Sequence, residues 1–264
     1  MIPKIIHYCW VGGAPLPEKE RQCIESWRKY CPDYEIKLWN ESNYDISQNE
    51  YIRQAYEVKR WAFVTDYVRL DVIYRYGGIY LDTDVEVIRS LDPLLEDSAF
   101  AGMENVDGQQ LSINTGLGFG AEKQHPIIGE WRSIYQDLSF LQADGTLDLL
   151  TTPARTTAQM EIHGFRQENI KQVVSGMTIY PTEYFCPKQY GCNDIFVTPN
   201  TFSIHHYSET WKSPEERKST QRWISLSRTF GSRTADIICG LYARYEQEGF
   251  PAVIKTILLK FFGR

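Results

Sequence analysis

The hydrophobic pattern of the first 40 residues alternates between strand and helix. An apolar run over residues 5–11 predicts a strand that ends at Gly12-Gly13, and a helix is expected through residues 21–27. Residues 34–39 then alternate polar and apolar side chains, which is typical of a second strand. This β-α-β order predicts an α/β domain with a mainly parallel central sheet.

A helix and an acidic strand follow. Apolar residues recur with helical period between Tyr56 and Tyr76, and Gly77-Gly78 supplies a C-terminal stop. The next run, residues 77–87 (GGIYLDTDVEV), reads as a buried strand that contains Asp82 and Asp84. Residues two apart in a strand project from the same face, so the sequence predicts two carboxylates that point together and repel each other.

A divalent cation would relieve that repulsion. Oxygen ligands without a cysteine or histidine in the run favour Mg²⁺ or Mn²⁺ over Zn²⁺, and Mg²⁺ takes further ligands from substrate phosphates. Asp82 and Asp84 therefore indicate a metal and phosphate site at the carboxyl end of a strand, where ligands collect in open α/β sheets. The alternative is a strand end whose acids simply reach solvent.

The preceding helix carries Asp66 and Arg69, which are neighbours on one helical face. They form either a surface ion pair or, if this face meets the acidic site, an acceptor and a donor for ligand hydroxyls.

Two downstream segments leave alternatives open. Gly116, Gly118 and Ala121 satisfy the dinucleotide fingerprint, but this match lies in the middle of the chain, and a tight glycine-rich strand-to-helix loop is the preferred interpretation.

Helical patterning resumes over residues 127–141, and a loop is expected at residues 151–153. His205 and His206 stand where a strand gives way to a loop, either as core-edge residues or with one completing an acidic metal shell.

Composition narrows the class of protein. The chain has 264 residues, so it suits one large or two small domains, and its net charge of −6 argues against general nucleic-acid binding. The six cysteines lack C-x-x-C spacing, which favours reduced thiols in a cytosolic protein, although Cys186 and Cys192 could meet across a loop. Neither a signal peptide nor a run long enough to span a bilayer is recognised, so we expect a cytoplasmic protein.

The last residues form a distinct pattern. Apolar residues recur at helical spacing over residues 252–264 beside Lys255, Lys260 and Arg264. The pattern fits a basic amphipathic helix on the inner face of an anionic membrane, and it fits equally a terminal helix docked on the core. We therefore expect a catalytic domain over residues 1–212 and a helical extension over residues 213–264.

Taken together, the motifs resemble glycosyltransferase family 32, the sugar-binding-region glycosyltransferases with a D-x-D motif. That family includes yeast mannosyltransferases and bacterial capsule enzymes, and the glucosylating clostridial toxins look like more distant relatives. The resemblance is carried by Ala62-x-x-x-Asp66-x-x-Arg69 and the run from Tyr76 to Asp84. It is close over residues 2–90 and recurs around residues 112–126 and 202–211.

The resemblance implies a GT-A fold, a nucleotide-sugar donor, a Mn²⁺ or Mg²⁺ ion and retention of anomeric configuration. By position, Asp66 and Arg69 would hold hydroxyls of the donor sugar. Asp82 would contact the ribose or donor sugar and the metal, while Asp84 and His205 would bind the metal. The remaining donor-binding positions that it implies are Trp10, Tyr80, Asn114, Thr210 and Trp211.

The expected function is transfer of a hexose or N-acetylhexosamine from a nucleoside-diphosphate sugar, with uridine diphosphate favoured, to a glycan acceptor. The setting would be surface polysaccharide synthesis in a bacterium, on an acceptor that can be lipid-linked. A metal-dependent sugar-binding module without transferase activity is the alternative. A phosphotransferase of the haloacid-dehalogenase type fails locally, because Glu86 occupies the fifth position of its motif.

Overall fold

The computed structural model describes residues 1–105, 110–188, 190, 194–210, 212–251 and 254. The chain divides into two compact units, Met1–Ser208 and Glu209–Arg264. The boundary lies four residues before the one expected from the sequence.

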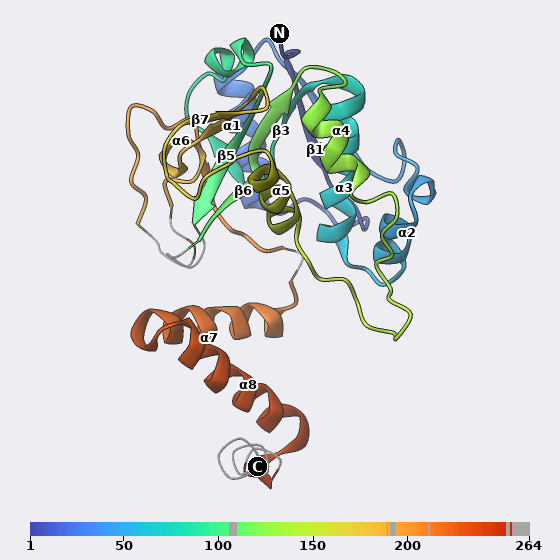
Figure 1. Cartoon of the computed structure of the whole chain (residues 1–264), viewed down its shortest axis with the longest axis vertical. Helices are drawn as coiled ribbons and strands as arrows, with labels where there is room; N and C mark the ends of the chain where they lie inside the picture. The colour runs from blue at the N-terminus through green and yellow to red at the C-terminus, as the bar shows by residue number, and fades with distance from the viewer. Residues whose placement is uncertain (106–109, 189, 191–193, 211, 252–253, 255–264) are drawn as a thin grey trace. The chain divides into compact units, whose positions relative to one another are not determined.

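A seven-stranded sheet forms the centre of the first unit, in the order β2-β1-β3-β6-β5-β8-β7 (Figure 1). The strands are β1 (Ile5–Cys9), β2 (Glu35–Trp39), β3 (Gly78–Tyr80), β5 (Ala99–Asn105), β6 (Leu111–Ala121), β7 (Gln172–Val174) and β8 (Met177–Tyr180). Only β6 and β7 run against the other five of these strands. The expected α/β fold with a mainly parallel central sheet is confirmed.

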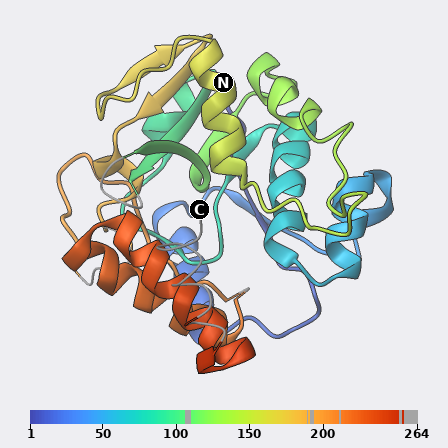
Figure 2. The same cartoon turned by 60° about the horizontal axis from the view of Figure 1, so that its bottom comes forward.

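Helices cover both faces of this sheet. In chain order they are α1 (Glu18–Tyr30), α2 (Glu50–Glu57), α3 (Trp61–Tyr76), α4 (Pro126–Ser133), α5 (Thr152–Ile162) and α6 (Thr182–Phe185), with short 3₁₀ turns at Ile46–Gln48 and Asp92–Glu96. Helices α3 and α4 lie side by side (Figures 1 and 2).

The side chains of each strand contribute alternately to two hydrophobic cores, because successive side chains point to opposite faces of the sheet. Ile79 packs with Trp27 of α1 in one hydrophobic cluster. Its neighbour Tyr80 packs in the other cluster, with Val64 and Val68 of α3. The acidic segment that follows Tyr80 thus begins from a strand that is buried on both sides.

Two expected helices differ from those observed. The pattern that starts at Tyr56 is divided, because α2 ends at Glu57 and α3 begins at Trp61. Lys59 between them has φ of 59°, a left-handed conformation that does not continue a helix. The helix expected over residues 127–141 ends at Ser133, and α5 begins at Thr152, where a loop was expected.

The glycine-rich segment is the interior of β6, and the strand-to-helix loop expected there is wrong. Phe119 of β6 pairs with Ala101 of β5, whereas Asn114 pairs with the next residue, Gly102. Residues 115–118 therefore bulge away from β5. Gly120 is required for close packing, since a Cβ there would stand 2.7 Å from the Phe100 ring.

The second unit is helical in its described part. It contains α7 (Pro214–Phe230) and α8 (Ser232–Glu248), joined at Gly231, whose φ of 80° favours glycine. Ser213 and Glu216 form a capping box at the start of α7. The Arg222 guanidinium lies 3.4 Å from the ring centre of Tyr242, which joins the two helices. Within the described residues, none of the helices has the length and apolar character that crossing a membrane requires.

Candidate active site

The two aspartates of the D-x-D motif lie on a turn between two short strands. Strand β3 ends at Tyr80, and β4 (Val85–Val87) pairs with β9 (Ser203–His205) in a separate two-stranded sheet. The single strand expected over residues 77–87 is therefore wrong. At this turn the two carboxylates take different partners, Arg69 for Asp82 and His205 for Asp84, and these positive groups offset the expected repulsion.

Asp82 faces Arg69. Arg69 lies in α3 with its side chain only 7% exposed, and its Nη2 stands 3.2 Å from Asp82 Oδ1 and 3.3 Å from Asp66 Oδ1. Tyr80 donates a hydrogen bond of 3.2 Å to Asp82 Oδ1, and its ring lies beneath the guanidinium at 5.0 Å. A buried guanidinium needs such carboxylate partners, and it fixes both of them in turn.

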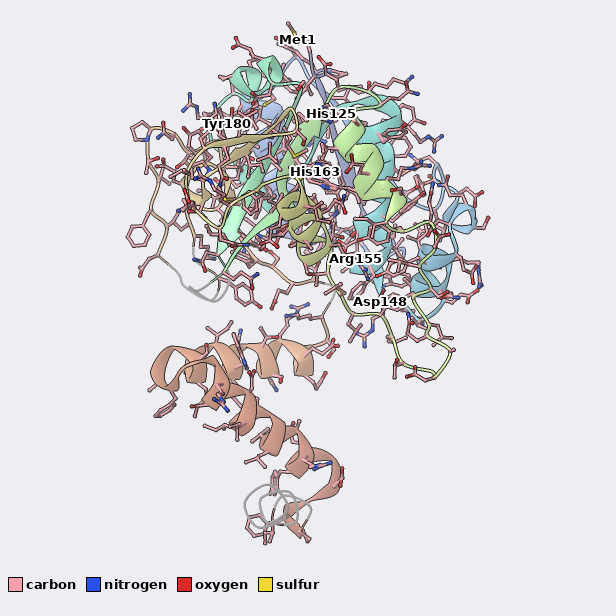
Figure 3. The ribbon with its side chains drawn as sticks, viewed as in Figure 1. Met1, His125, Asp148, Arg155, His163 and Tyr180 are labelled. Atoms are coloured by element: carbon pink, nitrogen blue, oxygen red, sulfur yellow. The ribbon has the colours of Figure 1, made fainter. Side chains whose placement is uncertain are left out.

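Asp66 is buried between the guanidinium and the start of α5. Its Oδ2 accepts a hydrogen bond of 3.4 Å from the backbone N–H of Thr152, the first residue of α5. Arg155, one turn further along α5, pairs with Asp148 in the loop before the helix (Figure 3). Burial raises the pKa of Asp66, although the positive charge of Arg69 opposes that shift.

Asp84 faces the segment that follows β9. Its Oδ1 lies 3.3 Å from His205 Nε2, and its Oδ2 accepts a hydrogen bond of 2.7 Å from the Ser208 backbone N–H. Burial disfavours the charged carboxylate, but His205 and the Ser208 N–H outweigh it and hold the pKa of Asp84 well below its usual range. Asp84 is thus ionised at neutral pH.

The register of β4 with β9 separates the two histidines. Val85 pairs with His205 and Glu86 pairs with Ile204, so His205 comes to lie against Asp84. His206 points elsewhere, with its Nε2 2.8 Å from Glu86 Oε2. The geometry therefore brings the imidazole of His205, and not that of His206, to the Asp84 carboxylate, although the His206 backbone N–H bonds to the Asp84 carbonyl at 3.0 Å.

Asn114 and Gly116 bring β6 to the same turn. The backbone N–H of Asp82 donates to the carbonyl of Gly116 at 3.0 Å, and the N–H of Gly116 donates to Asn114 Oδ1 at 2.6 Å. A Cβ on Gly116 would overlap Asp82 and stand 3.1 Å from Arg69 Nη1. The interpretation of these glycines as a loop missed this role. A glycine inside a strand can indicate that another segment of the chain approaches closely.

Glu104 of β5 is a site residue that the sequence reasoning missed. It is 5% exposed, and its carboxylate accepts long hydrogen bonds from Tyr207 Oη at 3.4 Å and Ser112 Oγ at 3.5 Å. Burial raises the pKa of Glu104, and hydrogen bonds from Asn114 and Tyr207 oppose the shift. Its signal in the sequence was the same as that of the aspartates, an acid in the otherwise apolar strand AFAGMEN.

The remaining expected donor-binding residues are Trp10, Thr210 and Trp211. Trp10 follows β1 at the carboxyl edge of the sheet, and its Nε1 donates to the Ala14 carbonyl at 2.6 Å. Thr210 is exposed and belongs to the second unit, and Trp211 lies outside the described residues. Cys186 is a buried thiol, and its suggested partner Cys192 lies outside the described residues as well.

The donor set at Asp84 suits a hard divalent cation in part. Asp84 supplies an ionised oxygen and His205 an adjacent imidazole nitrogen, which Mn²⁺ accepts together with oxygen ligands. His205 Nδ1 is buried and has no hydrogen-bond partner within the described part of the chain. Asp82 is held by Arg69, and no group of three His, Cys, Asp or Glu side chains among the described residues forms a metal cage. A cation here would need further ligands from the donor phosphates.

Comparison with known proteins gives the following relatives. Residues 17–101 match the family model described as glycosyltransferase sugar-binding region containing DXD motif. Over 139 residues the chain is 36% identical to inositol phosphoceramide mannosyltransferase 3 of Schizosaccharomyces pombe, covering 48% of this chain and 35% of that protein. It is 32% identical over 136 residues to a mannosyl phosphorylinositol ceramide synthase of Saccharomyces cerevisiae, with shares of 48% and 33%.

The chain spans about a third of the length of these curated relatives. Among solved structures, the PaToxG glycosyltransferase is similar with a TM-score of 0.45 and 20% identity, covering 61% of this chain and 69% of that one. The family resemblance drawn from the sequence is thus confirmed, and the matched region contains Asp66, Arg69, Asp82 and Asp84.

Proposed function

We propose that this chain, whose residues 17–101 belong to the glycosyltransferase sugar-binding regions containing the DXD motif, is a retaining and metal-dependent glycosyltransferase. It takes a hexose or N-acetylhexosamine from a nucleoside-diphosphate sugar and transfers it to a glycan acceptor. The observation that carries the proposal is the pairing of a buried Arg69 with Asp66 and Asp82 beside the ionised Asp84 and His205.

The Arg69 side of the site suits a polyol. The Arg69 guanidinium offers several N–H donors, while Asp66 and Asp82 offer acceptor oxygens. Asp82 is the more open of the two carboxylates, with 29% of its side chain exposed against 11% for Asp66. Adjacent donors and acceptors in fixed positions match neighbouring sugar hydroxyls, each of which donates one hydrogen bond and accepts others.

The Asp84 side of the site suits a diphosphate. When the bond between the sugar and the phosphate breaks, negative charge appears on the leaving diphosphate, and a bound divalent ion supplies positive charge there. Asp84 and His205 would hold that ion. Arg69 stays protonated and lies against Asp82 at the same turn, so its charge offsets part of the negative charge of the carboxylates there.

Asp66 is the one carboxylate that we considered as a covalent nucleophile, and its contacts argue against that role. One oxygen lies against Arg69 and the other accepts the Thr152 N–H. An attacking carboxylate oxygen needs a free lone pair aimed at the anomeric carbon. We therefore propose front-face attack by the acceptor hydroxyl, with Asp66 orienting the donor.

The test is a donor panel. The full chain is incubated with Mn²⁺ and nucleoside-diphosphate derivatives of mannose, glucose, galactose and N-acetylglucosamine, and the released nucleoside diphosphate is measured. Mannose enters the panel first because the two fungal relatives are named for mannosyl transfer. Slow hydrolysis of one donor that is lost in Asp84→Ala supports the transferase. Donor binding without turnover would favour the sugar-binding module instead.

We also propose that the enzyme works at the inner face of a membrane on a lipid-linked acceptor. Two observations support the proposal: the fungal relatives are named for ceramide lipids, and α8 carries exposed Ile237, Ile238, Tyr242 and Tyr245. Flotation with anionic and neutral vesicles tests it, comparing the full chain with a chain ending at Gly249. The matched control changes Lys255 and Lys260 to Glu, which keeps the length and reverses the charge. A full chain that floats with neither kind of vesicle would contradict the proposal, and equal flotation of all three proteins would assign the contact to α8 instead of the residues after Gly249.

A further inference from the structure

Glu104 is a buried carboxylate, and the cationic group that interacts with it electrostatically is the imidazole of His205, which already faces Asp84. The hydrogen-bond donors to Glu104 are neutral, namely Tyr207, Ser112 and Asn114. No Lys or Arg forms an ion pair with it in the part of the chain that the structure describes. A buried carboxylate is costly unless its hydrogen bonds compensate it, and its removal leaves the buried donors that face it without their acceptor.

Glu104 contacts both halves of the candidate site. On one side it accepts a hydrogen bond from the Asn114 amide, whose oxygen accepts the N–H of Gly116 next to Asp82 and Arg69. On the other side it accepts from Tyr207, which lies in the chain between the two residues that contact the Asp84 carboxylate, namely His205 and Ser208.

Tyr207 needs such an anchor. Its φ is 54°, a left-handed conformation that costs free energy in a residue with a bulky side chain. Its ring centre lies 4.2 Å from that of His205, so the position of one ring restricts the other. The strained backbone is what allows the imidazole of His205 and the N–H of Ser208 to reach the same carboxylate, and the side chain of Tyr207 must hold it in place.

Cys186 contacts the Tyr207 hydroxyl as well. Its Sγ lies 2.9 Å from Tyr207 Oη, and burial raises the pKa of the Cys186 thiol to about 12, so the thiol keeps its proton. The S–H has two acceptors within reach, Tyr207 Oη and the Lys188 carbonyl at 3.4 Å, and when it donates to Tyr207 the Tyr207 hydroxyl proton is left for Glu104. A carboxylate at position 104 is therefore suited to accept from both Tyr207 and Asn114.

We infer that Glu104 is a positioning residue that fixes Tyr207, and through it His205 and Ser208, against Asp84, while it orients Asn114 toward Gly116. The inference rests on the proposed function, because it assumes that the site binds a metal ion and a nucleotide-sugar donor. Because Glu104 acts through other residues, its loss changes affinity for the cation and the donor without removing a ligand of either.

The experiment measures Mn²⁺ binding to the full chain by electron paramagnetic resonance, beside donor kinetics and thermal melting. Tyr207→Phe keeps the ring and removes the hydroxyl, and it should raise the Mn²⁺ dissociation constant roughly tenfold, as is typical for partners of metal ligands. Glu104→Ala should raise it similarly and also raise the KM for the donor, because Asn114 is released too. Glu104→Gln should stay within about threefold, since its amide oxygen can still accept from Tyr207.

The matched control is Tyr180→Phe. Tyr180 lies on β8 (Figure 3). Its hydroxyl, like that of Tyr207, donates to a carboxylate, here Asp97 Oδ2 at 2.8 Å. The control should bind Mn²⁺ as the wild type does. The double variant Glu104→Ala/Tyr207→Phe should bind Mn²⁺ no more weakly than Glu104→Ala alone, because both changes remove the same hydrogen bond between Tyr207 and Glu104.

The outcomes separate the two proposals. If the wild type binds Mn²⁺ and the variants bind it more weakly, but no donor is turned over, the transferase proposal fails and the positioning role of Glu104 stands. If donors are turned over and the folded Tyr207→Phe and Glu104→Ala proteins match the wild type in Mn²⁺ affinity and donor KM, the inference about Glu104 is wrong. A wild type that binds no Mn²⁺ would overturn both the inference and the metal dependence.

Discussion

Gly116 of β6 lies so close to Asp82 that a Cβ on the glycine would overlap the Asp82 carboxylate. The bulge of residues 115–118 away from β5 makes this approach possible, and the N–H of Asp82 bonds to the Gly116 carbonyl at 3.0 Å. Gly116 therefore fixes where the first aspartate of the D-x-D motif can stand relative to Arg69.

Gly116→Ala should impair activity more than stability. The new methyl group must displace Asp82 or the strand, which should cost about 1 to 3 kcal/mol of unfolding free energy and reduce donor turnover at least about tenfold. The control is Gly120→Ala in the same strand, whose Cβ would meet Phe100 and the Gly78 carbonyl but not Asp82. Gly120→Ala should lose about as much unfolding free energy as Gly116→Ala, but each folded molecule should turn over the donor at the wild-type rate. Equal turnover in the two variants would show that the contact with Asp82 does not matter.

Arg69→Lys should be a severe change although it keeps the charge. One guanidinium nitrogen lies 3.2 Å from Asp82 and 3.3 Å from Asp66, and the planar group stacks on Tyr80. A lysine ammonium is a point charge that neither stacks flat nor spans both carboxylates in this way. We expect kcat/KM for the donor to fall on the order of a hundredfold. The control, Arg53→Lys, changes an exposed arginine paired with Glu50 and Glu57 and should leave the rate unchanged.

The α/β class and the placement of Asp66 and Arg69 on one helical face could be predicted from the sequence, whereas the meeting of that face with Asp82 was left open. The strand and helix periods of the first 90 residues are strong, and a buried acid in an apolar run is costly enough to indicate a function. What could not be predicted was the turn after Tyr80. A short apolar segment with two acids is compatible with one continuous strand, and only pairing of β4 with β9, more than 100 residues later, shows that the chain turns there.

The contributions of Glu104, Tyr207 and Gly116 also depend on contacts between distant residues. Glu104 meets Tyr207 across 103 residues of chain. Gly116 was assigned to a loop because glycines usually mark loops, whereas here close packing against Asp82 requires a glycine inside a strand. Local sequence can mark such a position as unusual, but it does not show which distant residue the position meets, and His205 could not be distinguished from His206 for the same reason.

The two adjacent histidines make a matched pair of variants. His205 Nε2 lies 3.3 Å from Asp84 Oδ1, while His206 Nε2 lies 2.8 Å from Glu86 Oε2. His205→Ala should weaken Mn²⁺-dependent donor turnover about 10- to 100-fold, because it removes a nitrogen donor next to Asp84. His206→Ala should stay within about twofold of the wild type, since its partner lies outside the acidic turn. Mn²⁺ titrations of initial rates would decide this, and the reverse ranking would contradict the assignment of His205.

Stability should fall at mildly acidic pH because of His7 in β1. Its Nδ1 accepts a hydrogen bond of 2.9 Å from Trp39 Nε1, and its Nε2 lies 2.9 Å from the Gly77 carbonyl. Both contacts suit the neutral imidazole with its proton on Nε2. Burial, which outweighs the Gly77 hydrogen bond, lowers the pKa of His7 from 6.5 to about 4.

The unfolded chain therefore binds more protons than the folded one between about pH 6.5 and pH 4. The contribution of the neutral His7 to the free energy of unfolding is complete above pH 6.5 and is lost as the pH falls toward 4. The shift corresponds to about 3 kcal/mol. Urea unfolding at pH 7.5 and 4.5 checks it against His7→Gln, which donates to Gly77 but does not titrate. The variant should be less stable at pH 7.5 and should lose less stability on acidification. An equal loss in both proteins would mean that other groups cause the pH dependence.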